Sequence, residues 1–218
     1  MTKKQPKQLI HSGYERRERD AYYTESWLTN VLLRHLKVRG KTVCDPAAGR
    51  GDILKAVEGS IHQGTGVNTL GYDIQPPRKP VRGVKIIKQD FLDPKFVIPP
   101  DVNIVITNPP FGTLAQKFVT KTLATGTVVK AAFLLKSVWN TSPGTKNSRR
   151  RLFDGTRPDL IPFAYEIVLT ERPTWDWWYV TKAEAEENNK PFHSYSWFVW
   201  DRDWKGPSTQ FWEGRLPR

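Results

Sequence analysis

The stretch KTVCDPAAGRGDILKAVEG, residues 41–59, decides the fold of this chain. Its first five residues predict a short strand, PAAGRGD predicts a turn, and ILKAVEG predicts a helix that ends at Gly59. Gly49 and Gly51 in the turn let the backbone approach a ligand that a Cβ atom would push away. The beginning of the helix offers free N–H groups to the same ligand. This order of elements indicates an α/β protein with a ligand site at the end of the strand.

Four acids narrow the chemistry of that ligand. Asp45 and Asp52 flank the glycines, where they would repel a pyrophosphate and would suit a ligand with an amino group and a positive sulfonium centre. S-adenosylmethionine is such a ligand. Asp73 ends the next strand, about 20 residues beyond the glycines, where nucleoside-binding α/β proteins place an acceptor for ribose hydroxyls. Asp90 ends the third strand, so Asp45, Asp73 and Asp90 all fall at predicted strand ends, where open α/β sheets bind their ligands.

Strand and helix patterns alternate along most of the chain. A first helix pattern, YYTESWLTNVLLRHL, has Thr24 as its expected N-cap. The elements expected after it are strands at 41–45, 69–74, 84–90, 102–108 and 128–136, a helix at 113–126, and two late strands at 163–170 and 195–201. The alternation predicts a parallel sheet with helices on both faces, and the late strands predict an antiparallel edge. A loop-like basic segment interrupts the pattern at 137–162.

Composition and charge restrict the classes of partner and compartment. The 218 residues carry a formal net charge of +12, and the pI is near 9.8. This charge favours a protein that binds nucleic acid over a basic protein without a polyanionic partner. Cys44 is the only cysteine, which excludes an intramolecular disulfide and suits a reducing compartment. Residues 1–20 are basic without the apolar core of a signal peptide, and no segment is apolar enough to span a membrane. We expect a soluble, cytoplasmic protein of a bacterial or phage-infected cell that binds no metal.

A second stretch, IVITNPPFG at residues 104–112, ends a buried strand with an asparagine and two prolines. Together with DPAAGRGD, the acid that ends the second strand and QDF after the third, it resembles the amino-group family of S-adenosylmethionine-dependent methyltransferases. The closest likeness is to DNA adenine-N6 methyltransferases, particularly small phage-type enzymes. Their Tyr-x-Thr-Pro-x-Trp pattern fits at Tyr22, Thr24 and Trp27, with Glu25 in place of the proline. The terminal YSWFVWDRDWKGPS is also similar, so the resemblance covers residues 20–208.

The resemblance implies a fold, a domain organisation and a cofactor. The fold is a Rossmann-like class I methyltransferase fold, with a mostly parallel seven-stranded sheet, an antiparallel C-terminal edge and helices on both faces. A single domain at 21–208 would lie between a basic flexible segment at 1–20 and a tail at 209–218. The cofactor would be S-adenosylmethionine. The residues implied to bind it are Tyr22, Thr24, Asp45, Pro46, Ala47, Gly49, Gly51, Asp73, Ile74, Asp90, Phe91 and Asn108.

The resemblance assigns the catalytic loop to Asn108, Pro109, Pro110 and Phe111. An exocyclic amino nitrogen is a poor nucleophile, because its lone pair is delocalised into the ring. The side-chain oxygen of Asn108 and the carbonyl of Pro109 can each accept one of its N–H bonds, and this attraction grows as positive charge develops on nitrogen. Phe111 can stack on the base. The two prolines restrict the backbone, so the loop has little freedom to lose on binding.

The substrate base must reach this loop. A base inside a duplex cannot do so, and it must therefore be flipped or already single-stranded. Positive charge would hold the phosphate backbone. The candidate contacts in the basic loop near 141–159 are Lys146, Arg149, Arg150, Arg151 and Arg157. A solvated charged loop explains the same segment equally well. The chain leaves no room for a large recognition domain, so we expect low or short sequence specificity.

DNA is the expected substrate, and three alternatives stay open. Adenine-N6 methylation of RNA is the first, because the same loop occurs in such enzymes. Methylation of protein glutamine on N5 is less favoured, because those enzymes generally have tyrosine where Phe111 stands. A non-catalytic nucleic-acid-binding protein is disfavoured, because every expected catalytic position is filled.

Most of the late tryptophans are expected in the core. The target sequence and the choice between monomer and homodimer are open.

Overall fold

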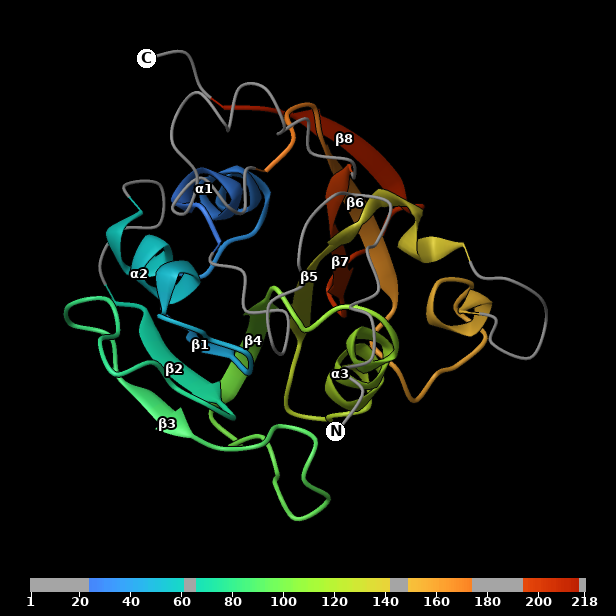
Figure 1. Cartoon of the computed structure of the whole chain (residues 1–218). Coiled ribbons are helices and arrows are strands. Elements are labelled where there is room, and N and C mark those ends of the chain that lie inside the picture. Colours follow the sequence, from blue (N-terminus) through green and yellow to red (C-terminus); the bar gives the residue numbers. More distant parts are fainter. Residues whose placement is uncertain (1–23, 61–65, 142–148, 174–193, 216–218) are drawn as a thin grey trace, which may run out of the picture.

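A computed structural model describes residues 24–60, 66–141, 149–173 and 194–215 of the chain (Figure 1). One sheet of eight strands runs through it in the order β3-β2-β1-β4-β5-β7-β6-β8. The strands are β1 (Thr42–Asp45), β2 (Asn68–Asp73), β3 (Ile86–Lys88), β4 (Val102–Thr107), β5 (Lys130–Lys136), β6 (Phe163–Leu169), β7 (Tyr195–Asp201) and β8 (Thr209–Glu213). The helices are α1 (Ser26–His35), α2 (Asp52–Gly59), α3 (Thr113–Leu123) and two short 3₁₀ helices, η2 (Ser137–Asn140) and η3 (Arg150–Leu152).

The strand directions confirm a mostly parallel α/β sheet. Strands β1 to β5 pair in parallel, and β6 pairs in parallel with β8. Only β7 runs against both of its neighbours, β5 and β6. Two details differ from the sequence-based expectation: the sheet has eight strands instead of seven, and the reversed strand lies inside the sheet instead of at its edge.

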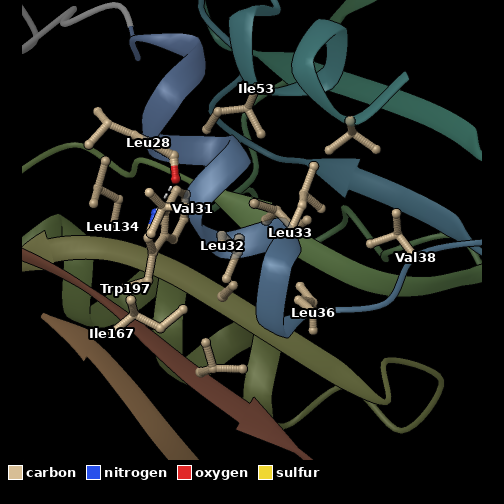
Figure 2. Close-up of a cluster of buried hydrophobic side chains, with 14 of the residues drawn as sticks. Leu28, Val31, Leu32, Leu33, Leu36, Val38, Ile53, Leu134, Ile167 and Trp197 are labelled. Atoms are coloured by element: carbon tan, nitrogen blue, oxygen red, sulfur yellow. Dashed lines mark hydrogen bonds between the residues drawn. The ribbon is translucent and has the colours of Figure 1, made fainter. Parts of the chain in front are cut away.

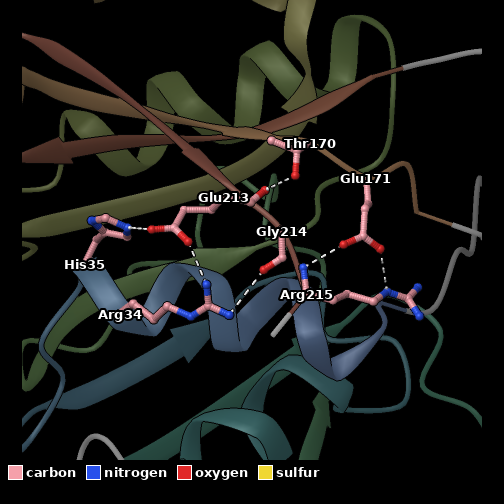
Figure 3. Close-up of polar contacts among 7 residues, drawn as sticks. All are labelled: Arg34, His35, Thr170, Glu171, Glu213, Gly214 and Arg215. Atoms are coloured by element: carbon pink, nitrogen blue, oxygen red, sulfur yellow. Dashed lines mark hydrogen bonds and ion pairs between the residues drawn. The ribbon is translucent and has the colours of Figure 1, made fainter. Parts of the chain in front are cut away.

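The C-terminal edge of the sheet is β8, which lies in the part of the sequence that was expected to be a tail. Its five residues alternate between half-buried and exposed positions, as an edge strand does. Figure 3 shows how α1 holds this strand: the guanidinium of Arg34 donates to Glu213 at 2.6 Å, and His35 Nε2 lies 2.7 Å from the other oxygen of the same carboxylate. The strand was missed because its partners, β6 and α1, are distant in sequence.

Two apolar cores lie on opposite faces of the sheet. Helices α1 and α2 pack on one face, and α3 packs on the other, as Figure 1 shows. Strand β5 is buried on both faces, with Ala132 and Leu134 in the first core and Phe133 and Leu135 in the second. This alternation follows from the two-residue period of a strand, and it explains the continuous apolar run AAFLL in the sequence.

Trp197 is the largest side chain in the first core. It is fully buried against α1, and its indole N–H donates to the carbonyl of Leu28 at 2.8 Å (Figure 2). Trp200, from the same strand, is buried in the second core. The expectation that late tryptophans pack in the core is confirmed for these two, whereas Trp212 on β8 is exposed.

The first helix begins later than expected. Glu25, and not Thr24, is the N-cap residue of α1, and no side chain caps the helix. The side chain of Thr24 is therefore available for another contact, which belongs to the site described below. No helix in the described parts of the chain has the length and apolar character that a membrane span requires.

Candidate active site

The carboxyl ends of the parallel strands assemble the predicted site residues along one edge of the sheet, called here the carboxyl edge. Asp45 is the last residue of β1, Asp73 is the last residue of β2, and Asn108 directly follows β4. Strand β1 lies between β2 and β4, with Asp45 opposite Gly71 and Cys44 opposite Val105. Because parallel strands end at the same edge, these three polar side chains are neighbours although 63 residues separate the first from the last.

The glycine turn is bound tightly to the end of β2. The backbone N–H of Gly49 donates to a carboxylate oxygen of Asp73 at 2.9 Å, and that of Ala48 donates to the carbonyl of Tyr72 at 2.8 Å. Gly51 has a φ of +92°, and a Cβ atom there would lie 2.6 Å from Cγ1 of Val84. Only glycine fits this position without displacing its neighbour, so the turn is fixed in place before any ligand arrives.

Asp45 is a buried acid at the centre of this arrangement. Its exposed fraction is 1%, and Ala47 donates a backbone hydrogen bond to it at 3.1 Å. Burial, with smaller contributions from the charges of Asp73 and Asp52, raises the pKa of Asp45 to about 7, and the bond from Ala47 opposes the rise. A cation beside Asp45 would favour its ionised form, so the group is suited to a positively charged ligand.

The adenosine-binding positions implied by the resemblance differ in their exposure. Asp73 receives the N–H of Gln75 at 2.7 Å in addition to that of Gly49, and Ile74 after it is 49% exposed. Asp90 is also exposed and accepts the N–H of Leu92 at 2.8 Å. Phe91 is 2% exposed, because its ring packs in the core of α3. The open apolar surface at this end of the site therefore belongs to Ile74 rather than to Phe91.

The NPPF loop contains an unusual polar atom. The side-chain amide of Asn108 donates to the hydroxyl of Thr24 at 3.3 Å, and Thr24 is buried. The side-chain oxygen of Asn108 is also buried, and it has no hydrogen-bond partner among the described residues. Leaving a buried acceptor unpaired costs about 1–3 kcal/mol, so such an atom needs an explanation. A ligand with an N–H donor would supply one.

The other residues of the loop form its rigid surroundings. Pro109 is buried, and Pro110 is half-buried. Phe111 is half-buried and packs against the core of α1 and α2, with its ring centroid 6.0 Å from that of Tyr195 at the beginning of β7. The loop thus joins the end of β4 to both the first core and α1, and its partners lie far from it in sequence.

Arg149, a predicted nucleic-acid contact, is bound within the protein. Its guanidinium donates to the carbonyls of Trp139 at 2.6 Å and Thr141 at 2.9 Å, and to the side chain of Gln116 on α3 at 3.3 Å. It also lies over the ring of Trp139, 4.6 Å from the centroid. These contacts connect η2 to α3, and they indicate a structural role for Arg149.

Two of the remaining predicted nucleic-acid contacts have acidic partners, and Arg151 and Arg157 line one pocket. Arg150 pairs with Asp154, and Arg157 pairs with Asp159. Of the described parts of the segment, η2 follows the carboxyl end of β5, whereas Ile161 donates to the carbonyl of Leu123 at 3.2 Å just before β6 begins at the opposite edge. Arg151 is exposed. Lys146 and Tyr22 lie outside the described residues.

A groove beside the NPPF loop was not expected from the sequence. It has a volume of about 820 Å³ and lies between α1 and α2. Among the residues that line it are Thr24, Trp27, Arg34, Arg50, Lys55 and Val81. The sequence signal that was overlooked is Arg50, a cation inside the glycine turn. No cluster of His, Cys, Asp and Glu suited to a metal ion occurs among the described residues.

No protein-family model and no curated protein matches the sequence. Solved structures do resemble it. A "putative class I S-adenosylmethionine-dependent methyltransferase" from Listeria monocytogenes is 15% identical at a TM-score of 0.53, over 87% of this chain and 62% of that one. A type I restriction-modification system methyltransferase subunit from Streptococcus thermophilus is 12% identical at a TM-score of 0.54, over 84% of this chain and 45% of that one.

A modification subunit of a "putative type I restriction enzyme" from Vibrio vulnificus gives a similar result, with 16% identity and a TM-score of 0.53 over 90% of this chain and 48% of that one. The chain therefore spans about half to three fifths of the length of these proteins. Together with the strand order and the single reversed strand, the similarities show that this chain has the class I methyltransferase fold.

Proposed function

We propose that the protein transfers a methyl group from S-adenosylmethionine to the exocyclic N6 amino group of adenine in DNA. The observation that carries the proposal is the buried side-chain oxygen of Asn108 at the carboxyl edge, which has no partner among the described residues and lies beside an acid-rich glycine turn. An amino group has the N–H donor that this oxygen lacks.

The residues of the glycine turn fit the proposed cofactor. S-adenosylmethionine supplies an electrophilic methyl group on a positive sulfonium centre. Asp45, buried beside Gly49 and Gly51, would favour that positive charge and the cofactor's amino group. Asp73 would hold the ribose hydroxyls, and the exposed side chain of Ile74 would pack on the adenine ring. Gly51 keeps the turn free of a Cβ atom at its closest approach to Val84.

The catalytic loop would act by holding the target nitrogen. Asn108 would accept one N–H bond of the amino group and the carbonyl of Pro109 the other, so that the nitrogen lone pair points out of the ring plane. Thr24 would keep the amide of Asn108 in this orientation, since its hydroxyl accepts the amide N–H at 3.3 Å. Both acceptors interact more strongly as nitrogen gains positive charge, which lowers the barrier rather than only strengthening binding.

The net charge of +12 favours a nucleic acid as the substrate, and two structural neighbours that are subunits of restriction-modification systems favour DNA. We expect a short or loose target sequence. The test is transfer of a labelled methyl group from S-adenosylmethionine to DNA and RNA in parallel, followed by nucleoside analysis. If labelled N6-methyladenosine is found only in RNA, the substrate is RNA instead of DNA. If neither DNA nor RNA is labelled, the proposal is overturned.

Asn108→Ala tests the mechanism. We expect methyl transfer to fall by at least about 100-fold, because an acceptor that acts in the transition state is lost. Binding of S-adenosylmethionine, measured by calorimetry, should stay within about twofold of wild type, since other residues hold it. The matched control is Asn68→Ala, an exposed asparagine at the amino end of β2, which should leave both measurements unchanged. Full activity of Asn108→Ala would disprove the role given to this residue.

A further inference from the structure

The segment that follows β2 and includes β3 carries the densest unpaired positive charge among the described residues near the carboxyl edge. Five cations lie between Ile74 and Gln89, and no acid lies among them. These residues, called here the cationic loop, are Arg78, Lys79, Arg82, Lys85 and Lys88. All five are exposed, and none forms an ion pair with a described residue. This differs from the segment at 149–159, where Asp154 and Asp159 pair with two of the arginines.

The cationic loop is fixed beside the glycine turn. The backbone N–H of Val81 donates to the carbonyl of Arg50 at 2.8 Å, and the side chain of Val84 packs against Gly51. Lys55 of α2 reaches the same loop, since its Nζ lies 3.7 Å from where a Cβ atom on Gly83 would be. In Figure 1, β3 is the outermost strand on one side of the sheet, with β2 next to it, and both lie below α2. Val81 and Val84 are therefore held against the glycine turn at the carboxyl edge, whereas Lys85 directly precedes β3, which runs parallel to β2 and so begins farther from that edge.

The groove between α1 and α2 connects this loop to the catalytic residues. Its lining runs from Val81 through Arg50 and Lys55 to Thr24, whose hydroxyl contacts Asn108. The groove walls hold the cations Arg34, Arg50, Lys55 and Arg215 against two acids, Glu25 and Asp52. Each of these cations has an acidic partner: Arg34 pairs with Glu213, Arg50 with Asp52, Lys55 with Glu58, and Arg215 with Glu25 and Glu171. The unpaired positive charge therefore belongs to the cationic loop, and the groove leads from that loop toward the oxygen of Asn108, which has no partner among the described residues.

We propose that the cationic loop binds the phosphate groups of the nucleic acid whose target base enters the NPPF loop; this rests on the proposed function. Strand β2 lies two strands from β4, a separation of about 10 Å, which is within reach of the phosphates that flank a base held at the end of β4. The bound strand would pass over the cofactor side of the carboxyl edge, and the segment at 149–159 would contribute little.

Two triple variants with equal charge changes test this. The first is Arg78→Gln, Lys79→Gln and Arg82→Gln in the cationic loop. The second, the matched control, is Lys37→Gln, Arg39→Gln and Lys41→Gln, three exposed cations without ion pairs to described residues, placed just before β1 at the opposite edge of the sheet. Both variants remove three positive charges, so they change the long-range attraction of a polyanion equally.

The measurement is the anisotropy of labelled single-stranded and duplex DNA, without cofactor, at salt concentrations from about 50 to 200 mM. For the loop variant we expect about tenfold weaker binding or more, and a dependence of log K on log salt that is shallower by about 2 to 3, as for the loss of three phosphate contacts. The control variant should keep the wild-type slope.

Equal losses in both variants, or wild-type binding by the loop variant, would overturn the inference. This readout needs no methyl transfer, so it separates the two proposals. If no nucleic acid is methylated but the loop variant alone loses binding, the phosphate-binding surface stands and the proposed reaction fails. If DNA is methylated and the loop variant binds as wild type does, the reaction stands and this surface is wrong.

Discussion

The two halves of the sheet differ in how completely their side chains are satisfied. In the half formed by β5 to β8, Trp197 and Phe198 are fully buried, and the indole of Trp197 has a hydrogen-bond partner. In the half formed by β1 to β4, Asp45 is a buried acid with a raised pKa, and Asn108 has a buried oxygen without a described partner. Packing stabilises the first half, whereas the second half keeps polar groups that the proposed ligands would satisfy.

Removing Trp197 should have the largest effect on folding. We expect Trp197→Ala to lower the free energy of unfolding by about 3–5 kcal/mol, because a large buried ring is replaced by a cavity. Trp197→Phe keeps most of the ring and removes the N–H that reaches Leu28, and it should cost less. Urea unfolding monitored by circular dichroism measures both. If Trp197→Ala weakened cofactor binding by the folded protein, the two halves would not be separable.

Asp45 should destabilise the folded protein at neutral pH. Its pKa is about 7 when folded and 3.8 in a model compound. Between these values the folded protein holds a proton that the unfolded chain has released, so stability should decrease as pH rises from about 4 to about 7 and then level off. The full shift corresponds to about 4 kcal/mol as an upper bound.

Asp45→Asn should remove this pH dependence and raise stability at pH 8, while weakening the binding of S-adenosylmethionine. In the wild type, affinity for a cationic ligand should increase as pH rises through about 7, because the ionised carboxylate binds it better. Thermal unfolding and calorimetric titration from about pH 5 to 9 test both statements. A variant with the wild-type pH profile would show that Asp45 is not the titrating group.

The contact between α1 and β8 should have the smallest effect. Burial alone would raise the pKa of Glu213, but hydrogen bonds from His35 and Arg34 outweigh it and hold that pKa below its usual value. The stabilisation is therefore present above the unfolded pKa and is lost as pH falls through the lowered folded pKa. Glu213→Gln should cost at most about 1 kcal/mol, and less in high salt. Urea unfolding at two salt concentrations checks this; a salt-independent loss would contradict it.

Local sequence patterns were enough to predict the elements that surround the site. The strand, glycine turn and helix at 41–59 and the strand that ends in NPPF appear as expected, because each depends on neighbours along the chain. The pattern did not reveal β8, because a five-residue edge strand is defined by pairing with β6 and by contacts with Arg34, 179 residues before Glu213. It also placed Thr24 at a helix cap, whereas tertiary contact with Asn108 uses that hydroxyl.

The sequence did not show which positively charged side chains would be bound to acids or carbonyls in the folded protein. The sequence predicted nucleic-acid contacts at the arginines of 149–157. In the fold, Arg149 donates to a backbone carbonyl, and Arg150 and Arg157 pair with acids. The cationic loop looked like an ordinary connection, and only its packing on Gly51 places it beside the site.

The sequence by itself determined that this protein is an α/β sheet with its polar residues at strand ends, because periodicity, glycine turns and proline rings act over a few residues. Only the tertiary structure decided which of those residues meet, and which cations and which buried oxygens have no partner among the described residues, because burial and pairing depend on segments that are far apart along the chain.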